Sequence, residues 1–156
     1  MSERIRVSFF VPGIPRPGGS KRAMPHSKTG KIIVLPASKY TADWRAAVAA
    51  KACEVWGTRP LLRTACVVDF QFQFPRPKSH YRSGRDATTL KMTAPWEHTQ
   101  RPDRGKLLRS TEDALTGVIW LDDCLIVGGK VEKCWGEPAG AHITIRSVNH
   151  GESEEK

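Results

Sequence analysis

Residues 64–74 form a stretch of alternating polarity that restricts the possible folds more than any other part of the chain. The side chains of one face are Cys66, Val68, Phe70, Phe72 and Phe74, and those of the other face are Val67, Asp69, Gln71 and Gln73. A period of two predicts a β-strand. This strand fits a sheet with one face covered by helices and the other partly exposed to water. We interpret Asp69 as part of the wet face; a metal ligand is the alternative.

Two helices and several more strands are expected around this strand. Residues 4–11 alternate as a strand, and residues 31–35, 125–134 and 141–148 read as further short strands, with a turn at 136–140. Ser38 or Thr41 is expected to cap a helix that runs to about Trp56 and packs its apolar stripe into the core. We expect one domain over residues 1–148, followed by a frayed acidic tail at 149–156.

Charge points to a polyanionic partner. The 156 residues carry a formal net charge of +9, and residues 76–110 hold nine Lys/Arg against three acids. Such a basic surface is typical of proteins that bind nucleic acid, although scattered surface lysines are the alternative. The four cysteines show no CxxC pairing, and no export signal or membrane-spanning stretch is found, which indicates a reducing, cytosolic compartment.

Other classes of site are not indicated. The chain has no Walker loop, no dinucleotide fingerprint and no nucleophile elbow, and its five histidines lack metal-ligand spacing. We therefore expect no small-molecule cofactor.

Residues 101–123, RPDRGKLLRSTEDALTGVIWLDD, combine a basic approach, an amphipathic helix and aspartates at both ends. Gly117 is placed to end the helix, and a short apolar return leads to Asp122 and Asp123. If the chain folds back there, Asp103 approaches Asp123, and two carboxylates among Lys and Arg side chains suit a divalent metal at a phosphate backbone. Taken alone, Asp103 also suits a helix N-cap and the Asp pair a solvated turn.

Two irregular segments are candidates for nucleic-acid contact. Residues 12–25, PGIPRPGGSKRAMP, form a loop that can lay backbone amides and cations against phosphates. Residues 75–102 interleave cations with aromatic side chains, which suits stacking on unpaired bases. We expect residues 75–102 to be a flexible arm that becomes ordered on DNA. For residues 12–25, an ordinary surface loop is the alternative.

The block at 101–123 resembles the signature of RusA-type Holliday-junction resolvases, whose motif has an Asp, a second Asp two residues later, a basic residue four further on, and a terminal Asp-Asp pair. The matching residues are Asp103, Gly105, Lys106, Arg109, residues 113–117 (DALTG) and residues 120–123 (WLDD). Residues 13–22, GIPRPGGSKR, and the SKxxxxWR pattern from Ser38 to Arg45 are similar to the actinobacterial-phage branch of the family.

The resemblance implies an α+β fold, here a single domain with a mixed β-sheet and two main helices packed on one face. It also implies a homodimer that binds four-way DNA junctions and cuts paired phosphodiesters with Mg²⁺, or with Mn²⁺ as a substitute. Such a protein would act in the cytoplasm of a bacterial host that is infected by a phage or carries a prophage. Asp103 and Asp123 would hold the metal, with Asp122 as a further candidate, and Arg109 with Lys106 would stabilise the charge at the phosphate. The residues expected to contact DNA are Arg16, Lys21, Arg22, Arg101 and Arg104.

Gly105 stands at the family's second Asp position. A metal held by two carboxylates in place of three loses charge and one oxygen ligand. Three explanations are open. Asp122 or Asp113 supplies the missing carboxylate, the site has degenerated naturally, or an Asp at position 105 was deliberately replaced. A non-catalytic junction-binding protein is the alternative function.

Overall fold

The computed structural model describes residues 4–19, 22–35 and 38–148. Within these ranges a five-stranded mixed sheet has the order β1–β7–β4–β5, with β6 also paired to β4. The strands are β1 (Arg6–Pro12), β4 (Cys66–Phe74), β5 (Ile126–Gly128), β6 (Val131–Trp135) and β7 (Gly140–Ser147). Strand β4 pairs antiparallel with β7 and parallel with β5 and β6. The expected α+β fold with a mixed sheet is confirmed.

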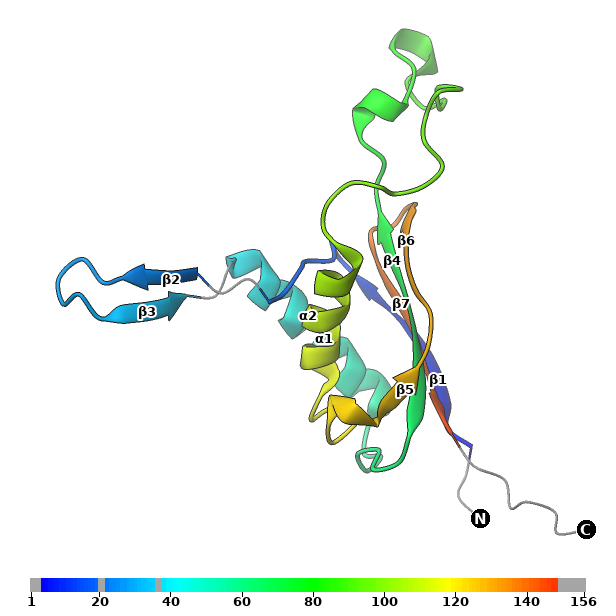
Figure 1. Ribbon diagram of the computed structural model, residues 1–156. Helices are drawn as coiled ribbons and strands as arrows, with labels where there is room; N and C mark the ends of the chain where they lie inside the picture. The colour runs from blue at the N-terminus through cyan, green and yellow to red at the C-terminus, as the bar shows by residue number, and fades with distance from the viewer. Residues whose placement is uncertain (1–3, 20–21, 36–37, 149–156) are drawn as a thin grey trace, which may run out of the picture.

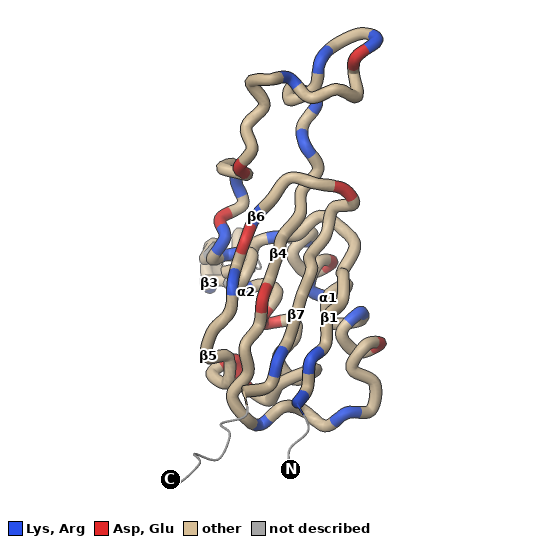
Figure 2. The backbone as a smooth tube through the Cα atoms, turned by 90° about the vertical axis from the view of Figure 1, so that its right-hand side faces the viewer, with Lys and Arg blue, Asp and Glu red and all other residues tan. Residues whose placement is uncertain are grey.

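Helices α1 (Lys39–Trp56) and α2 (Arg104–Leu115) cover one face of this sheet, while the other face is open (Figure 1). The alternation of β4 explains this arrangement, because its even-numbered side chains from Cys66 to Phe74 are all buried under the helices. On the open face, which is turned to the viewer in Figure 2, Asp69 pairs with Arg146 at 2.7 Å and accepts a hydrogen bond from the Lys130 backbone N–H at 2.9 Å. Asp69 is thus held on the polar face by its neighbours.

The predicted helix ends agree well with the structure. Ser38 caps α1, and its hydroxyl accepts a hydrogen bond from the Tyr40 N–H at 3.2 Å. Asp103 occupies the N-cap position of α2, but its carboxylate makes no capping hydrogen bond. Gly117 follows α2 with a φ of 82°, which a residue with a side chain rarely adopts.

Two predictions of strand and loop boundaries were wrong. Residues 125–134 were expected as one strand, but they split into a 3₁₀ turn, η3 (Asp123–Leu125), and the strands β5 and β6. The split falls at Gly129, where a φ of 138° and the close approach of the Val68 carbonyl leave no room for a side chain. Residues 12–25, expected as a loop throughout, contain β2 (Arg22–Pro25), which pairs with β3 (Ile32–Leu35) in a separate hairpin. This hairpin extends away from the sheet (Figure 1).

The two helices are joined through a buried hydrogen-bond chain. Trp44 of α1 donates its indole N–H to the Thr111 hydroxyl at 3.2 Å, and this hydroxyl donates to the Leu107 carbonyl at 2.9 Å. Thr111 is fully buried and Trp44 nearly so. Because no water reaches the pair, the indole N–H depends on Thr111 for its partner.

Replacing Thr111 by Val should therefore lower the free energy of unfolding by about 1–3 kcal/mol, since the indole N–H is left buried without an acceptor. Urea denaturation measures the change. Thr111→Ser, which keeps the hydroxyl, is the control and should lose less. A Val variant as stable as the wild type would contradict the role of this bond.

Among the residues that the structure describes, no helix combines the length and apolar character needed to cross a membrane.

Candidate functional site

The first part of the site is the segment of residues 13–19, which lies across both helices. Its backbone is fixed at several points: the Gly18 N–H donates to the Lys106 carbonyl at 2.9 Å, and the Ser110 hydroxyl donates to the Arg16 carbonyl at 2.6 Å. From α1, the Thr41 hydroxyl donates to the Pro17 carbonyl at 2.8 Å. We call residues 13–19 the docked loop.

Glycine makes this close approach possible. A Cβ atom at Gly18 would lie 2.8 Å from the Ser110 Cβ, well inside contact distance, and one at Gly19 would lie 3.0 Å from an Arg109 guanidinium nitrogen. The Arg109 side chain therefore lies beside the docked loop, at the middle of α2. The docked loop and the helix that bears the candidate catalytic residues form one unit.

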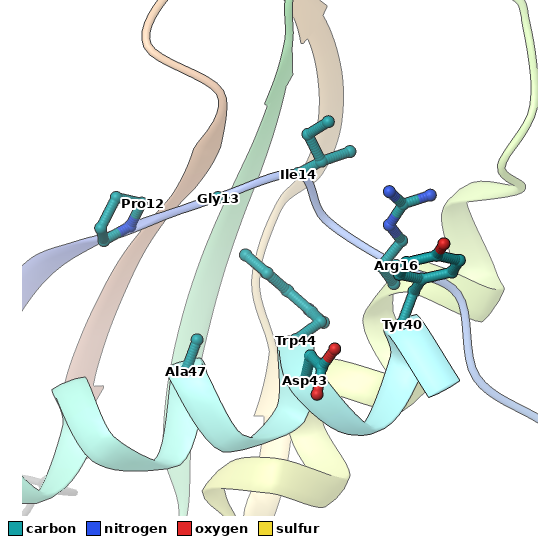
Figure 3. A pocket seen from close by; sticks show the side chains of 8 residues that line it. All are labelled: Pro12, Gly13, Ile14, Arg16, Tyr40, Asp43, Trp44 and Ala47. Carbon is teal, nitrogen blue, oxygen red and sulfur yellow. The ribbon is translucent and has the colours of Figure 1, made fainter. Parts of the chain in front are cut away.

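Arg16 presents the charge of the docked loop. Its guanidinium lies 4.9 Å from the centre of the Tyr40 ring, a cation–π contact. Together with Ile14, Asp43 and Trp44, these side chains line a hollow of about 280 Å³ (Figure 3).

The other predicted DNA-binding residues are placed as follows. Arg101 and Arg104 are exposed at the start of α2. Arg104 also lines a second hollow, of about 450 Å³, together with Lys133 of β6. Lys21 lies outside the described residues, and Arg22 begins β2 with a side chain that is not described.

At the start of α2, Asp103 and Lys106 lie together. The Asp103 carboxylate is 3.7 Å from the Lys106 ammonium, and both side chains are more than half exposed. Gly105 is exposed between them, and a Cβ added there would meet no described atom within 4 Å. An aspartate at position 105 would therefore fit without displacing a neighbour.

At the other end of α2, Asp122 is the N-cap of η3 and Asp123 is its first residue. The Asp122 carboxylate accepts a hydrogen bond from the Cys124 N–H at 2.9 Å, and this bond lowers the pKa of Asp122. Asp123 is close enough to Glu112 for its charge to act on it: burial first, and then the charges of Asp123 and Asp113, raise the pKa of Glu112.

The structure thus brings Asp103 to Lys106 and Asp123 to Glu112, at the two ends of a helix about 18 Å long. No three His, Cys, Asp or Glu side chains in the described ranges gather closely enough to hold a metal ion. Of the acids considered as replacements at position 105, Asp113 pairs with Arg45 of α1 at 3.3 Å and Asp122 caps the η3 turn. Within the described residues, the predicted ligands Asp103 and Asp123 therefore have different neighbours, and neither of the two acids considered for position 105 is free of other contacts.

The sequence analysis missed Glu112. The signal was present, because positions 105, 109 and 112 share one face of a helix. The neighbour of Glu112, Asp123, lies outside the helix, so their proximity depends on the tertiary fold.

The mixed sheet, the two helices on one face and the cationic loop bound to α2 define an α+β domain with a surface suited to nucleic acid. The chain matches the family described as Endodeoxyribonuclease RusA over residues 12–146, and it belongs to this family. Among curated proteins, none matches the chain.

Replacing Gly18 by Ala tests the contact between the docked loop and α2. The new methyl group would overlap the Ser110 side chain, so we expect the free energy of unfolding to fall by about 1–3 kcal/mol and DNA binding to weaken as the loop shifts. Urea denaturation and fluorescence anisotropy with labelled DNA measure the two effects.

Gly105→Ala is the matched control, because it adds the same methyl group in open space and should be neutral or stabilise α2 by up to about 1 kcal/mol. Unchanged stability and affinity in Gly18→Ala would show that the docked loop does not depend on this contact.

Proposed function

We propose that this chain is a structure-selective endodeoxyribonuclease that resolves four-way (Holliday) DNA junctions. The observation that carries the proposal is the match to the RusA family, because it runs through the docked loop, both helices and the Asp122–Asp123 pair. An origin in the actinobacterial-phage branch and action in the cytoplasm of the bacterial host are parts of the same proposal, supported by the resemblance of residues 13–22.

Contacts with the DNA backbone are assigned to the basic side chains on the helix side of the domain. Arg16 on the docked loop and Arg101 with Arg104 at the start of α2 would neutralise phosphates, and Lys21 and Arg22 would extend this surface. Such contacts do not depend on base sequence. Selection for a junction must therefore come from the shape of the DNA.

The proposed reaction is Mg²⁺-dependent hydrolysis of a phosphodiester, with Mn²⁺ as an alternative ion. Asp103 and Asp123, with Asp122, are the protein donors proposed for the ion, which would polarise the phosphate and activate a water molecule. Lys106 and Arg109 would counter the negative charge that develops on the phosphate. Their positions support this role, since both cations belong to α2 and Arg109 lies beside the docked loop.

Paired cuts on opposing strands need two sites, so we propose a symmetric homodimer.

Gly105 favours a second candidate, a junction-binding protein with little or no nuclease activity. Mg²⁺ usually takes one or two protein carboxylates together with water and phosphate oxygens. With Gly at position 105, the charged group that the structure places beside Asp103 is the Lys106 ammonium, and this helix position adds no carboxylate.

Gly105→Asp separates the two candidates. We expect this variant to cut a labelled four-way junction in Mg²⁺ or Mn²⁺ much faster than the wild type, because the new carboxylate joins Asp103 at the start of α2. Gly105→Asn, equal in shape and without charge, is the control and should not gain activity. Gel analysis of the cleaved strands gives the rates.

Equal cleavage by the wild type and Gly105→Asp would mean that another carboxylate completes the site, with Glu112 beside Asp123 as the first to test. Binding without cleavage by every variant would reject the nuclease and leave the junction-binding function.

A further inference from the structure

Residues 75–102 form an arm that leaves the end of β4, projects beyond the sheet and returns to the start of α2 (Figures 1 and 2). The arm was expected to be ordered only on DNA, but it already has its own hydrogen-bonded turns. The Arg82 N–H donates to the Thr89 carbonyl and the Lys91 N–H to the His80 carbonyl, both at 2.9 Å. Together with the Tyr81–Leu90 bridge, these bonds join the outgoing and returning halves.

The base of the arm is built around Trp135 of β6. The His98 ring lies 4.1 Å from the Trp135 ring, His80 meets its edge at 5.0 Å, and the Arg76 guanidinium lies 5.7 Å from it. His80 and His98 are buried in this cluster. The arm is therefore anchored to the sheet by stacked side chains.

Trp96, like Met92, exposes a large apolar side chain on the arm, and the residues on both sides of Trp96 are hydrogen-bonded. The carbonyl before it, that of Pro95, accepts a hydrogen bond from Arg76 at 2.7 Å, and the carbonyl after it, that of Glu97, accepts one from the Trp135 indole at 3.1 Å. The Trp96 side chain is nevertheless 87% exposed, whereas Trp44, Trp56 and Trp120 are buried. A large apolar ring kept in water on a fixed backbone indicates a contact surface.

Trp96 is also tied to the candidate site. Between it and Asp103, the Lys133 ammonium binds the carbonyls of Gln100 and Pro102 at 2.7 and 3.0 Å. The segment from the exposed indole to the first candidate catalytic residue is therefore fixed to β6, and a group stacked on Trp96 would lie near the start of α2.

The charge of the arm identifies the partner. Residues 75–102 hold six Lys/Arg against two acids. Lys78, Arg82 and Lys91 line a hollow of about 580 Å³ on the arm. Cations beside an exposed aromatic ring are the combination that binds unpaired bases and their phosphates. A second copy of the arm would bring the same positive charge and be repelled.

We propose that Trp96 is a base-stacking residue, which receives a base exposed at the branch point of a DNA junction while the arm's cations hold the neighbouring phosphates. This inference rests on the proposed function and adds the element that recognises the branch. Since the backbone around Trp96 is already fixed, stacking requires little further ordering of the protein.

The test compares the wild type with Trp96→Ala and Trp96→Phe. Each protein is titrated onto a four-way junction, a linear duplex and a single strand at the same salt concentration, with 2-aminopurine at the branch point of the junction to report stacking. We expect Trp96→Ala to bind the junction about tenfold more weakly with little change on the duplex, and to lose the 2-aminopurine response, whereas Trp96→Phe keeps most of both.

Val127→Ala is the control, since it shortens another exposed apolar side chain, 63% exposed on β5, away from the arm. It should bind both DNAs like the wild type.

Unchanged junction binding and an unchanged 2-aminopurine signal in Trp96→Ala would overturn the assignment, whether or not the protein cuts junctions. A change in oligomeric state in Trp96→Ala, measured by sedimentation, would also overturn it, because the indole would then be covered by a second copy. If the wild type shows no preference for junctions but Trp96→Ala loses affinity for a single strand, the stacking role stands and the proposed junction function fails.

Discussion

The contact between the docked loop and α2 is the constraint on which the candidate site depends. The loop reaches the helix backbone only because Gly18 has no side chain at the point where it meets Ser110. This approach lets the Gly18 N–H bind the Lys106 carbonyl and the Ser110 hydroxyl bind the Arg16 carbonyl, and it places the docked loop beside the Arg109 side chain. A segment rich in Pro and Gly, which forms no element of its own here, is thereby given a defined position.

The electrostatics of α2 explain why position 105 matters. Lys106 neutralises Asp103 at one end of the helix, while at the other end Glu112 and Asp123 are two acids that oppose each other's charge. A cation is favoured where negative charge is in excess, and at the start of α2, where Gly105 adds no carboxylate, the charge of Asp103 is offset by Lys106.

Local patterns in the sequence were sufficient for much of the fold. The alternation of residues 66–74 fixed which face of β4 the helices cover, and Ser38 marked the start of α1 through its capping hydroxyl. The break at Gly129 could not be predicted, because it arises from the Val68 carbonyl on a neighbouring strand. The ordered base of the arm also lay beyond local patterns, since Trp135 is distant in sequence from the residues that stack on it.

For the candidate site too, some features followed from local sequence patterns and others depended on contacts between distant residues. The order of Asp103, Arg109 and Asp123 along the chain was sufficient to indicate the family, which the match over residues 12–146 establishes. The pairing of Asp123 with Glu112 depends on how the chain turns after Gly117, and no local pattern specified it. The ion pair between Asp113 of α2 and Arg45 of α1 was equally hidden, since it needs both helices in place.

The central claim, that this domain recognises branched DNA, is tested most directly by the affinity of the wild-type protein for a four-way junction and for a linear duplex of the same arm sequence. Both are measured by fluorescence anisotropy at one salt concentration and without divalent metal, so that binding is separated from cleavage. The account predicts binding at least about tenfold tighter to the junction, because stacking adds to phosphate contacts that both DNAs share. Equal affinities would contradict it and leave a basic domain that binds any DNA through its backbone.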